Sequence, residues 1–251
     1  MSAVGRTRID QAWPQQAIDL DDEALLALYA RERPWLRVNF VSSLDGAATR
    51  AGTSGGLSPE ADRRVFDALR RLCDVVMVGA GTVRTEGYTA MRVDAESAAW
   101  RLAHGLSEHP VFCLVSARLD LDPQSPIFQD APVRPVIMTV SSAPADRRAA
   151  LAEVADVVDA GEREVDAGRA RAALIERGLA GILCEGGPSL FGSVLAADAA
   201  DELCLTLAPT LEAGDARRIA SGALPEPRGM SLGHVLVGGD ALLLSYRRAA
   251  R

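Results

Sequence analysis

Short apolar segments that alternate with helical patterns restrict the fold of this chain more than any other feature of its sequence. The strands predicted from these segments cover residues 75–78, 111–116, 136–140, 154–158 and 181–184. Runs that are apolar at every position are typical of strands in parallel sheets, where helices bury both faces. The pattern therefore predicts a three-layer α/β fold, with a mainly parallel mixed sheet and helices on both faces.

The two ends of the chain complete this prediction. Residues 233–237 and 241–247 flank Gly238-Gly239-Asp240, which is a strong signal for an antiparallel C-terminal hairpin. Further strands are predicted over 36–42 and 202–208, and helices over 21–31, 58–72 (capped by Ser58), 145–153, 165–177 and from Pro188 onward. Residues 1–18 lack periodicity and are predicted to form a loosely attached arm. We expect an N-terminal arm and helix over residues 1–33, and a single domain over residues 34–251.

The balance of charges excludes several classes of function. The chain carries a formal net charge of −7, and nucleic acid repels a protein without a basic excess. All 27 of its basic residues are arginine, which rules out mechanisms that need a lysine Schiff base or a lysine general base. We therefore expect a small-molecule substrate and no nucleic-acid partner.

Cysteine, histidine and hydropathy patterns indicate a metal-free protein of the cytoplasm. The four cysteines stand singly, without the Cys-x-x-Cys spacing of zinc sites, and the three histidines lack metal-like spacing. Buried free thiols are typical of a reducing compartment. No apolar run approaches the roughly 18 residues of a membrane span, and the N-terminus lacks the apolar core of a secretory signal. We expect no metal, no membrane contact and a cytoplasmic location.

The stretch from Gly181 to Leu195 combines a buried strand, a paired-glycine turn and a helix. Gly186 and Gly187 allow the backbone to approach a ligand closely, and Pro188 suits the first turn of a helix. The N–H groups at the start of that helix favour an anion. The pattern is equally compatible with a phosphate-bearing cofactor and with a tight turn of purely structural role.

A second glycine turn, Gly79-Ala80-Gly81-Thr82, follows the strand at 75–78. It lacks the third glycine of the dinucleotide fingerprint, because Arg84 stands there, but its backbone N–H groups and the Thr82 hydroxyl suit a phosphate. Strands of a parallel sheet end at one edge, so both glycine turns are predicted to face one crevice.

Three acids, Asp45, Glu86 and Glu185, follow apolar strands by a few residues. Acids that converge on one sheet edge suit a polar substrate that has to be hydrogen-bonded and protonated. Acids at strand ends are also common as solvated residues, so both interpretations stay open at this point.

Four segments, taken together, carry a resemblance to a known family: VNFVSSLDG at 38–46, VGAGTV at 78–83, EGGPSL at 185–190 and DEL at 201–203. In order and spacing they resemble the C-terminal reductase domain of the RibD family of riboflavin biosynthesis, and the matches run from about Pro34 to Tyr246. The resemblance implies a dihydrofolate reductase-like fold, a homodimer and NADPH as the cofactor. It also implies reduction of the ribose of 5-amino-6-(5-phosphoribosylamino)uracil by hydride transfer to C1′.

The resemblance assigns roles to individual residues. The residues that it implies for NADPH are Ser42, Thr82, Ser116 and the run from Gly187 to Ser193, which includes Pro188, Ser189 and Leu190. From the two glycine turns we add Gly79, Gly81 and Gly186 to the cofactor site, and we expect Arg118, near Ser116, to meet the 2′-phosphate. The residues that it implies for the substrate are Ser54, Arg70, Glu86 and Glu185, with Arg70 as a clamp for the phosphate. Asn39, Glu86 and Glu185 are expected to line the catalytic pocket, and Asp45 is expected to hold its own loop.

This chain departs from the family pattern on the substrate side. Asn39 stands where the family has lysine, and the run from Glu86 to Ala90 replaces an Asp-x-Pro-x-Leu segment. The motif of the zinc deaminase that usually accompanies this reductase is absent, so we expect a stand-alone reductase. Two alternatives stay open: a reductase of a pterin such as dihydrofolate, and a nucleotide-binding protein without catalytic activity.

Overall fold

The computed structural model describes residues 6–224 and 226–249. Within these ranges the strands are β1 (Asp10–Trp13), β2 (Trp35–Ser43), β3 (Val75–Gly79), β4 (Val111–Val115), β5 (Val136–Thr139), β6 (Asp156–Asp159), β7 (Gly181–Cys184), β8 (Glu202–Ala208), β9 (Met230–Gly238) and β10 (Ala241–Arg248). The helices are α1 (Asp22–Tyr29), α2 (Glu60–Leu72), α3 (Ala80–Glu86), α4 (Ala95–Ala103), α5 (Pro126–Gln129), α6 (Ala145–Ala152), α7 (Ala167–Glu176) and α8 (Pro188–Ala196).

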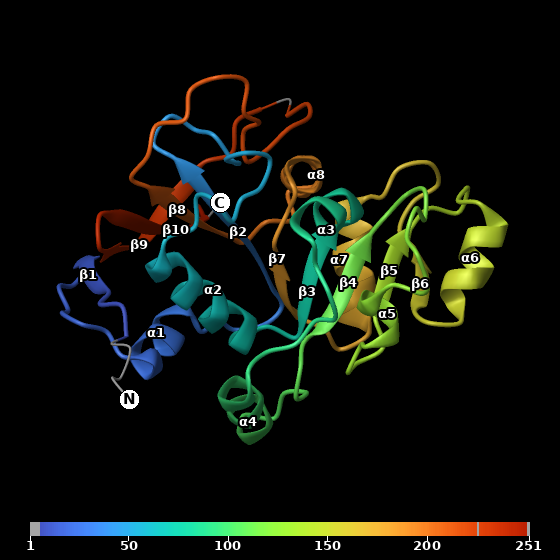
Figure 1. Cartoon of the computed structure of the whole chain (residues 1–251), viewed down its shortest axis with the longest axis horizontal. Helices are drawn as coiled ribbons and strands as arrows, with labels where there is room; N and C mark the ends of the chain where they lie inside the picture. The colour runs from blue at the N-terminus through green and yellow to red at the C-terminus, as the bar shows by residue number, and fades with distance from the viewer. Residues whose placement is uncertain (1–5, 225, 250–251) are drawn as a thin grey trace.

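These strands form one ten-stranded sheet in the order β1-β9-β10-β8-β2-β7-β3-β4-β5-β6 (Figure 1). Every pair from β8 to β6 is parallel, whereas β10, β9 and β1 are antiparallel to their neighbours. The turn at Gly239-Asp240 joins β9 to β10, and Gly239 has a φ of +60° there. The expected α/β sheet, mainly parallel with a C-terminal antiparallel hairpin, is confirmed.

Two hydrophobic clusters lie on opposite faces of the sheet and make the fold three-layered. In β3, Val76 and Val78 belong to the first cluster, and Val75 and Met77 belong to the second. Side chains of α1 and α2 complete the first cluster, and side chains of α7 and α8 complete the second. Because successive residues of a strand point to opposite faces, a strand covered on both sides has to be apolar at every position.

The prediction of a loosely attached N-terminal arm is wrong for the part of it that the structure describes. Residues Asp10–Trp13 form β1, an edge strand that pairs with β9, and Ile9 is completely buried in the first cluster. Residues 1–5 of the predicted arm lie outside the described residues. A short polar strand on a sheet edge has little hydrophobic pattern, which explains why periodicity does not reveal it. The domain boundary at residue 34 stays a prediction.

The starts of several helices differ from the sequence-based prediction. Ser58 is not the cap of α2: the cap residue is Pro59, and the Ser58 hydroxyl donates to the Asp62 carboxylate instead. The predicted glycine turn after β3 is the start of helix α3, with Gly79 as its cap. The sequence analysis also passed over α4 and α5, although Asp94 caps the first and Pro126 opens the second.

The carboxylate of Glu202, at the start of β8, joins four parts of the chain. It is completely buried and accepts bonds from Arg31 Nη2 at 2.6 Å and from Arg37 Nε at 2.7 Å. Its other donors are Trp35 Nε1 at 3.1 Å and the Ser245 hydroxyl at 2.6 Å. Burial alone would raise the pKa of Glu202, but the two guanidinium groups and the hydroxyl lower it to about 2. The group is therefore an anion in the folded protein.

All four cysteines are free and buried. Burial raises the pKa of Cys73, Cys113 and Cys184 to about 12, and it raises the pKa of Cys204 further. These thiols are therefore protonated inside the core. None of the helices in the described ranges has the length and the apolar character needed to cross a membrane.

Replacing the Glu202 carboxylate by an amide tests its role in the scaffold. In Glu202→Gln the buried Arg37 and the half-buried Arg31 lose their counter-charge, so we expect the free energy of unfolding at pH 7 to fall by about 3–5 kcal/mol. Urea denaturation measures this change. Asp240→Asn in the hairpin turn is the matched control, with an expected change within about 0.5 kcal/mol.

The same pair of proteins has a defined pH dependence. The pKa of Glu202 is lowered from 4.5 to about 2, so its stabilisation is complete above the pKa of the unfolded chain. It is lost as the pH falls from about 4.5 towards 2, and the stability difference between the wild type and Glu202→Gln should shrink over that interval. A difference that stays constant down to pH 3 would contradict this account.

Candidate active site

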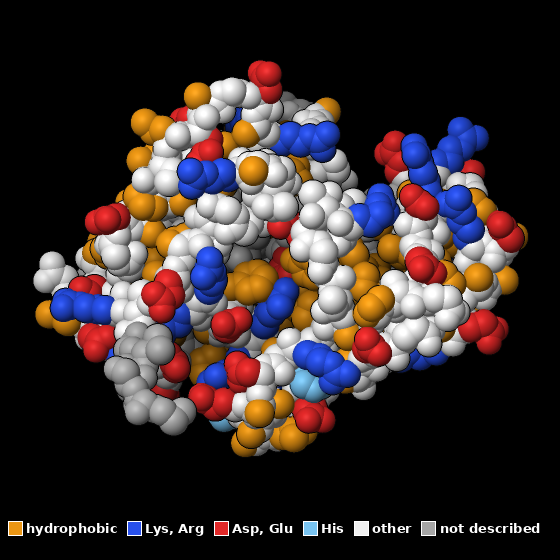
Figure 2. All heavy atoms as spheres, viewed as in Figure 1, with side chains coloured by type: hydrophobic (Ala, Val, Ile, Leu, Met, Phe, Trp, Pro, Cys, Tyr) orange, Lys and Arg blue, Asp and Glu red, His pale blue; other side chains and the backbone are white. Residues whose placement is uncertain are grey.

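A cavity of about 1700 Å³ opens at the carboxyl ends of β2, β7 and β3. The sheet order places these strands side by side, so Asn39, Glu185 and Gly79 all line it. The space-filling view shows this face hollowed near its centre, where apolar and oppositely charged side chains gather (Figure 2). A pocket for one small ligand usually has about 300–1000 Å³, so this cavity has room for two ligands.

Helix α8 starts at the wall of the cavity without a side-chain cap. Its cap residue is Gly187, and Pro188, Ser189 and Leu190 follow along the lining. The N–H groups of a first turn have no partner inside the helix, and the helix dipole makes this end positive. The predicted anion-binding end of this helix therefore faces the cavity.

The two glycines before α8 are required by the protein itself. Gly186 has a φ of +84°, and a Cβ there would lie 2.5 Å from Cζ of Phe40. A Cβ on Gly187 would lie 2.3 Å from the Thr82 hydroxyl oxygen. Gly186 is not part of the lining, so packing against β2 and α3 explains this glycine pair better than the ligand approach that the sequence suggested.

The second glycine turn forms the opposite wall. Strand β3 runs directly into α3, whose cap residue Gly79 also has no side-chain cap bond, and the Gly79 N–H donates to the Gly186 carbonyl. A Cβ on Gly81 would meet no atom within 4 Å, so this glycine leaves open space beside the helix start. Gly79, Gly81 and Thr82 all line the cavity, which confirms that the two turns face one crevice.

Arg70 and Glu185 form a two-point ion pair in the cavity wall. Arg70 Nε and Nη2 donate to the two Glu185 carboxylate oxygens at 2.7 Å and 2.8 Å, and the Tyr88 hydroxyl donates to one of them at 2.8 Å. The Arg70 guanidinium also lies 4.2 Å from the centre of the Phe66 ring. Bonds of this geometry fix both side chains in one orientation.

Electrostatics keep Arg70 and Tyr88 in the protonated forms that donate to Glu185. Burial alone would lower the pKa of Arg70, but the Glu185 carboxylate raises it above its usual range. Burial and the Glu185 charge raise the pKa of Tyr88, so its phenol stays protonated and continues to donate. Two residues predicted to bind substrate are thus bound to each other, and two of the three Arg70 guanidinium nitrogens expected to clamp a phosphate already donate to Glu185.

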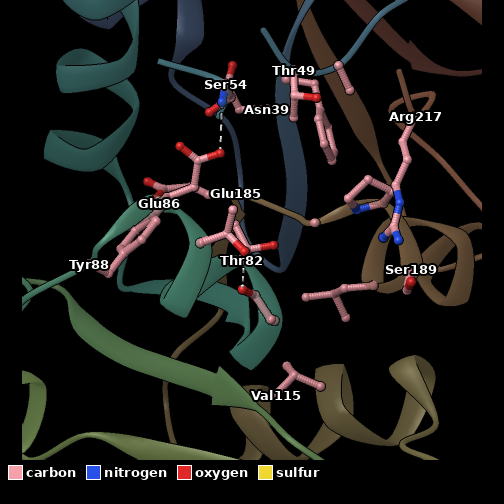
Figure 3. Close-up of a pocket in the computed structure, with 18 of the residues that line it drawn as sticks. Asn39, Thr49, Ser54, Thr82, Glu86, Tyr88, Val115, Glu185, Ser189 and Arg217 are labelled. Atoms are coloured by element: carbon pink, nitrogen blue, oxygen red, sulfur yellow. Dashed lines mark hydrogen bonds between the residues drawn. The ribbon is translucent and has the colours of Figure 1, made fainter. Parts of the chain in front are cut away.

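Glu86 ends α3 and projects into the cavity. Its Oε1 accepts the backbone N–H of Ser54 at 2.8 Å, which ties the loop before α2 to the end of α3 (Figure 3). Figure 3 shows Ser54, Glu86 and Tyr88 on one side of the pocket, with Ser189 and Arg217 on the other. Asn39, on β2, completes the polar lining.

Several residues predicted to bind the cofactor do not line the cavity. The Ser42 hydroxyl donates to the Ser43 carbonyl, and the backbone N–H of Ser116 donates to Met138. Both serines are buried, and neither they nor Arg118 form part of the lining. Ser42 lies near the end of β2, whereas Ser116 and the exposed Arg118 follow β4.

Asp45, by contrast, holds a loop, as its expected role requires. Its carboxylate accepts bonds from the Ser43 hydroxyl at 2.5 Å and from the backbone N–H groups of Glu212 and Ala213 at 3.2 Å and 2.7 Å. The Ser43 hydroxyl and these two N–H groups lower the pKa of Asp45 to about 2. The loop after β2 is thereby joined to the segment after β8.

Sequence reasoning missed several lining residues. Asp62 and Phe66 precede Arg70 at intervals of four along α2, so that one helix face lines the cavity. This spacing was a usable signal. Arg217 comes from the segment after β8, and Ala48 of the opposite loop donates its N–H to the Arg217 carbonyl. No local pattern marks that long-range contact.

None of the described residues that line the cavity is a histidine. His234 is completely buried, and burial lowers its pKa to about 4. Across residues 6–224 and 226–249, no group of three or more His, Cys, Asp or Glu side chains is arranged to hold a metal ion. The chemistry of the cavity rests on arginine, carboxylate and helix-end donors.

Comparisons with known proteins identify the family of this chain. The family model described as the RibD C-terminal domain matches residues 34–243. A 2,5-diamino-6-ribosylamino-4(3H)-pyrimidinone 5′-phosphate reductase from Methanothermobacter thermautotrophicus is 34% identical over 194 residues, which cover 76% of this chain and 85% of that relative. A relative of the same description from Archaeoglobus fulgidus is 28% identical over 183 residues, which cover 72% of this chain and 83% of that protein.

Solved structures show the same fold. The crystal structure of a pyrimidine reductase-like protein from Corynebacterium diphtheriae matches with a TM-score of 0.80 at 26% identity, covering 87% of this chain and 93% of that one. A deaminase/5-amino-6-(5-phosphoribosylamino)uracil reductase from Thermotoga maritima matches in fold alone, with a TM-score of 0.64 at 19% identity. This chain covers 57% of the Thermotoga protein. The dihydrofolate reductase-like architecture predicted from the sequence is confirmed, and the chain belongs to the RibD C-terminal domain family.

Proposed function

We propose that this protein is an NADPH-dependent reductase of riboflavin biosynthesis that acts on a phosphoribosylamino-pyrimidine. One observation carries the proposal: a single cavity joins the uncapped start of α8 to the acid-lined ends of β2, β7 and α3. A dinucleotide needs donors for its phosphates, and the sugar-linked pyrimidine needs hydrogen-bonding groups beside them. Both requirements meet in this space.

The reduction converts a ribosyl group into a ribityl group. The C1′–O4′ bond breaks, a C1′–H bond forms from the hydride, and O4′ takes up one proton. Relatives at 34% and 28% identity are named for the 2,5-diaminopyrimidinone form of the substrate, whereas the Thermotoga protein is named for the deaminated uracil. We therefore place the diaminopyrimidinone first and keep the uracil derivative as the second substrate.

The residues at the cavity suit NADPH. Neither α8 nor α3 has a side-chain cap, and Gly81 leaves space at its Cβ position. The Arg217 guanidinium has no hydrogen-bond or salt-bridge partner among the described residues, so it is free to meet a phosphate. When bound, the cofactor supplies the hydride.

On the substrate side, Asn39 and Glu86 are the polar groups that we assign to the reacting sugar. Glu86 is the proposed proton donor to O4′, and Ser54 positions it through the backbone N–H. Glu185 has both oxygens engaged by Arg70 and Tyr88, so we assign this pair a positioning role. Arg63 and Arg92 line the cavity with exposed side chains and are the proposed partners of the substrate phosphate.

We also propose a homodimer in the cytoplasm. Leu205, Leu244 and Val235 lie side by side on the sheet face opposite the first core cluster, as do Leu207, Leu242 and Val237. None of these six residues belongs to a core cluster, and Leu242 is 39% exposed. A second copy that covers this face would bury it. The free, buried cysteines support a reducing compartment.

Following NADPH absorbance tests the activity and the role of Glu86. The wild type should oxidise NADPH with a phosphoribosylamino-pyrimidine, and Glu86→Gln should lower kcat by about 10²–10⁴-fold because glutamine carries no transferable proton. The glutamine Oε1 still accepts the Ser54 N–H, so the loop keeps its anchor. Glu153→Gln, at the exposed end of α6, is the control, and dihydrofolate is the competing substrate. Turnover of dihydrofolate alone would replace this proposal with the pterin alternative.

A methyl group at Gly81 probes the cofactor contact. Gly81→Ala has open space inside the protein and a helical backbone, so we expect the fold to keep its stability or to gain up to about 1 kcal/mol. The methyl group would clash with a bound dinucleotide and weaken its binding free energy by about 1–3 kcal/mol. This loss corresponds to roughly 5- to 150-fold weaker NADPH binding. Fluorescence titration measures the change. Gly229→Ala, away from the cavity, should bind normally; equal affinity in both variants would remove Gly81 from the cofactor site.

A charge on the open sheet face probes the dimer. Leu242→Glu should shift the protein from dimer to monomer at micromolar concentration in sedimentation velocity, because an unpaired carboxylate would be buried between copies. Leu102→Glu, on α4 and 58% exposed, is the control and should stay dimeric. A wild-type protein that sediments as a monomer would refute the dimer.

A further inference from the structure

The cavity contains a buried carboxylate that the proposed reaction does not use. Asp62 lies in the first turn of α2, is 5% exposed and lines the cavity. Among the described residues its carboxylate has no salt bridge; the hydroxyls of Ser58 and Thr206 bond to it instead. Burial raises the pKa of Asp62, and the two hydroxyl groups oppose that rise. The Arg63 charge on the same helix also lowers this pKa, but no arginine forms an ion pair with Asp62 among the described residues, so the burial of this acid needs a reason.

The hydroxyl bonds leave part of this carboxylate free. An ionised carboxylate has about four acceptor positions on its two oxygens. Ser58 and Thr206 occupy two of them, so about two remain for a group inside the cavity. A ligand with two adjacent N–H donors would complete the set.

The surroundings of Asp62 suit a flat ring. Phe66 stands one turn further along α2 and also lines the cavity, and Arg70 with its partner Glu185 follows after the next turn. On the β2 side, Val41 and Ala48 add apolar surface to the same lining. In such a site the carboxylate can bind the edge of a heterocycle, while the faces of the ring pack against the apolar and aromatic side chains of the wall.

We propose that Asp62 recognises the N3–H and 2-amino edge of a 2-amino-4-oxopyrimidine ring and thereby selects the diaminopyrimidinone substrate over its deaminated uracil counterpart. The inference deepens the proposed function and rests on it. In the 4(3H)-pyrimidinone, N3 carries a hydrogen and C2 carries an amino group, so two parallel N–H donors face the two carboxylate oxygens. Such charge-assisted, two-point bonds are the stronger kind.

The uracil form offers this carboxylate the wrong pattern. Its C2 carries an oxygen, so one donor becomes an acceptor that faces a carboxylate oxygen of like charge. A site built to hydrogen-bond one group discriminates strongly against an analogue that lacks it, because its own buried polar atoms are left unpaired. Specificity at C2 follows from one side chain.

Replacing Asp62 by asparagine exchanges one acceptor for one donor and tests the idea directly. The amide oxygen accepts from N3–H and the amide nitrogen donates to the C2 oxygen, so Asp62→Asn matches the uracil. We expect the wild type to prefer the diaminopyrimidinone by about 100-fold or more in kcat/KM, and Asp62→Asn to lose or reverse that preference. NADPH oxidation is followed with each 5′-phosphate substrate separately.

Asp67→Asn is the matched control. Asp67 lies on the same helix and is exposed outside the cavity, so this variant should keep the wild-type ratio. Equal losses on both substrates in Asp62→Asn, with the ratio unchanged, would overturn the assignment. So would a wild type that does not distinguish the two substrates, a result that requires no folded variant. Dihydropterin has the same 2-amino-4-oxo edge. In Asp62→Asn, kcat/KM for dihydropterin should therefore fall together with kcat/KM for the diaminopyrimidinone.

Binding of the free bases separates this inference from the proposed reaction. Calorimetric titration of the NADPH-bound wild type with 2,5,6-triamino-4(3H)-pyrimidinone and with 5,6-diaminouracil should favour the first, and Asp62→Asn should narrow or invert the difference. If neither phosphate substrate is reduced but this preference holds, the reaction is wrong and the Asp62 assignment stands. If reduction occurs but the wild type binds both free bases equally well, Asp62 does not recognise the 2-amino edge of the ring.

Discussion

The buried carboxylate of Glu202 fixes the junction on which the arrangement of this protein depends. Glu202 and Arg37 are direct cross-strand partners where β8 pairs with β2, and their side chains form the salt bridge. A slip of one residue between these strands would separate the two charges and turn Asn39 away from the cavity. Ser245 and Arg31 attach β10 and the chain after α1 to the same group. One ion cluster therefore sets both the sheet register and the position of the first pocket residue.

The active-site wall repeats this principle with a second buried pair. Arg70 and Glu185 are 115 positions apart, yet they close the gap between α2 and the end of β7. Tyr88 adds the chain after α3 to the same carboxylate. Three segments of the cavity wall are thus joined at one carboxylate, while Glu86 and Asp62 line the cavity without an ion pair among the described residues. Ion-paired side chains frame the ligand space, and the less engaged acids are the ones to which we assign recognition and proton transfer.

The sequence predicts most of the sheet but only part of the site, for physical reasons that differ between residues. Strands β7 and β8 are predicted with the bounds that the structure has, because continuous and alternating apolar patterns depend only on neighbouring positions. β1 is not predicted, because an exposed edge strand needs no apolar face. The Arg70–Glu185 ion pair is not predicted, because no local sequence pattern links two residues so distant in the chain. Gly187 lines the crevice as predicted and Gly186 does not, and the contacts of the two glycines with Thr82 and Phe40 depend on tertiary packing.

The four buried thiols can report local unfolding of the native structure. A thiol that is protonated and shielded reacts with an alkylating reagent only when its surroundings unfold. Cys204 lies in β8, next to the antiparallel part of the sheet, whereas Cys113 lies in β4 within the parallel part. Cys184 sits at the end of β7 beside the cavity. The order in which reagents modify these positions therefore maps which region of the native fold opens first, without any engineered label.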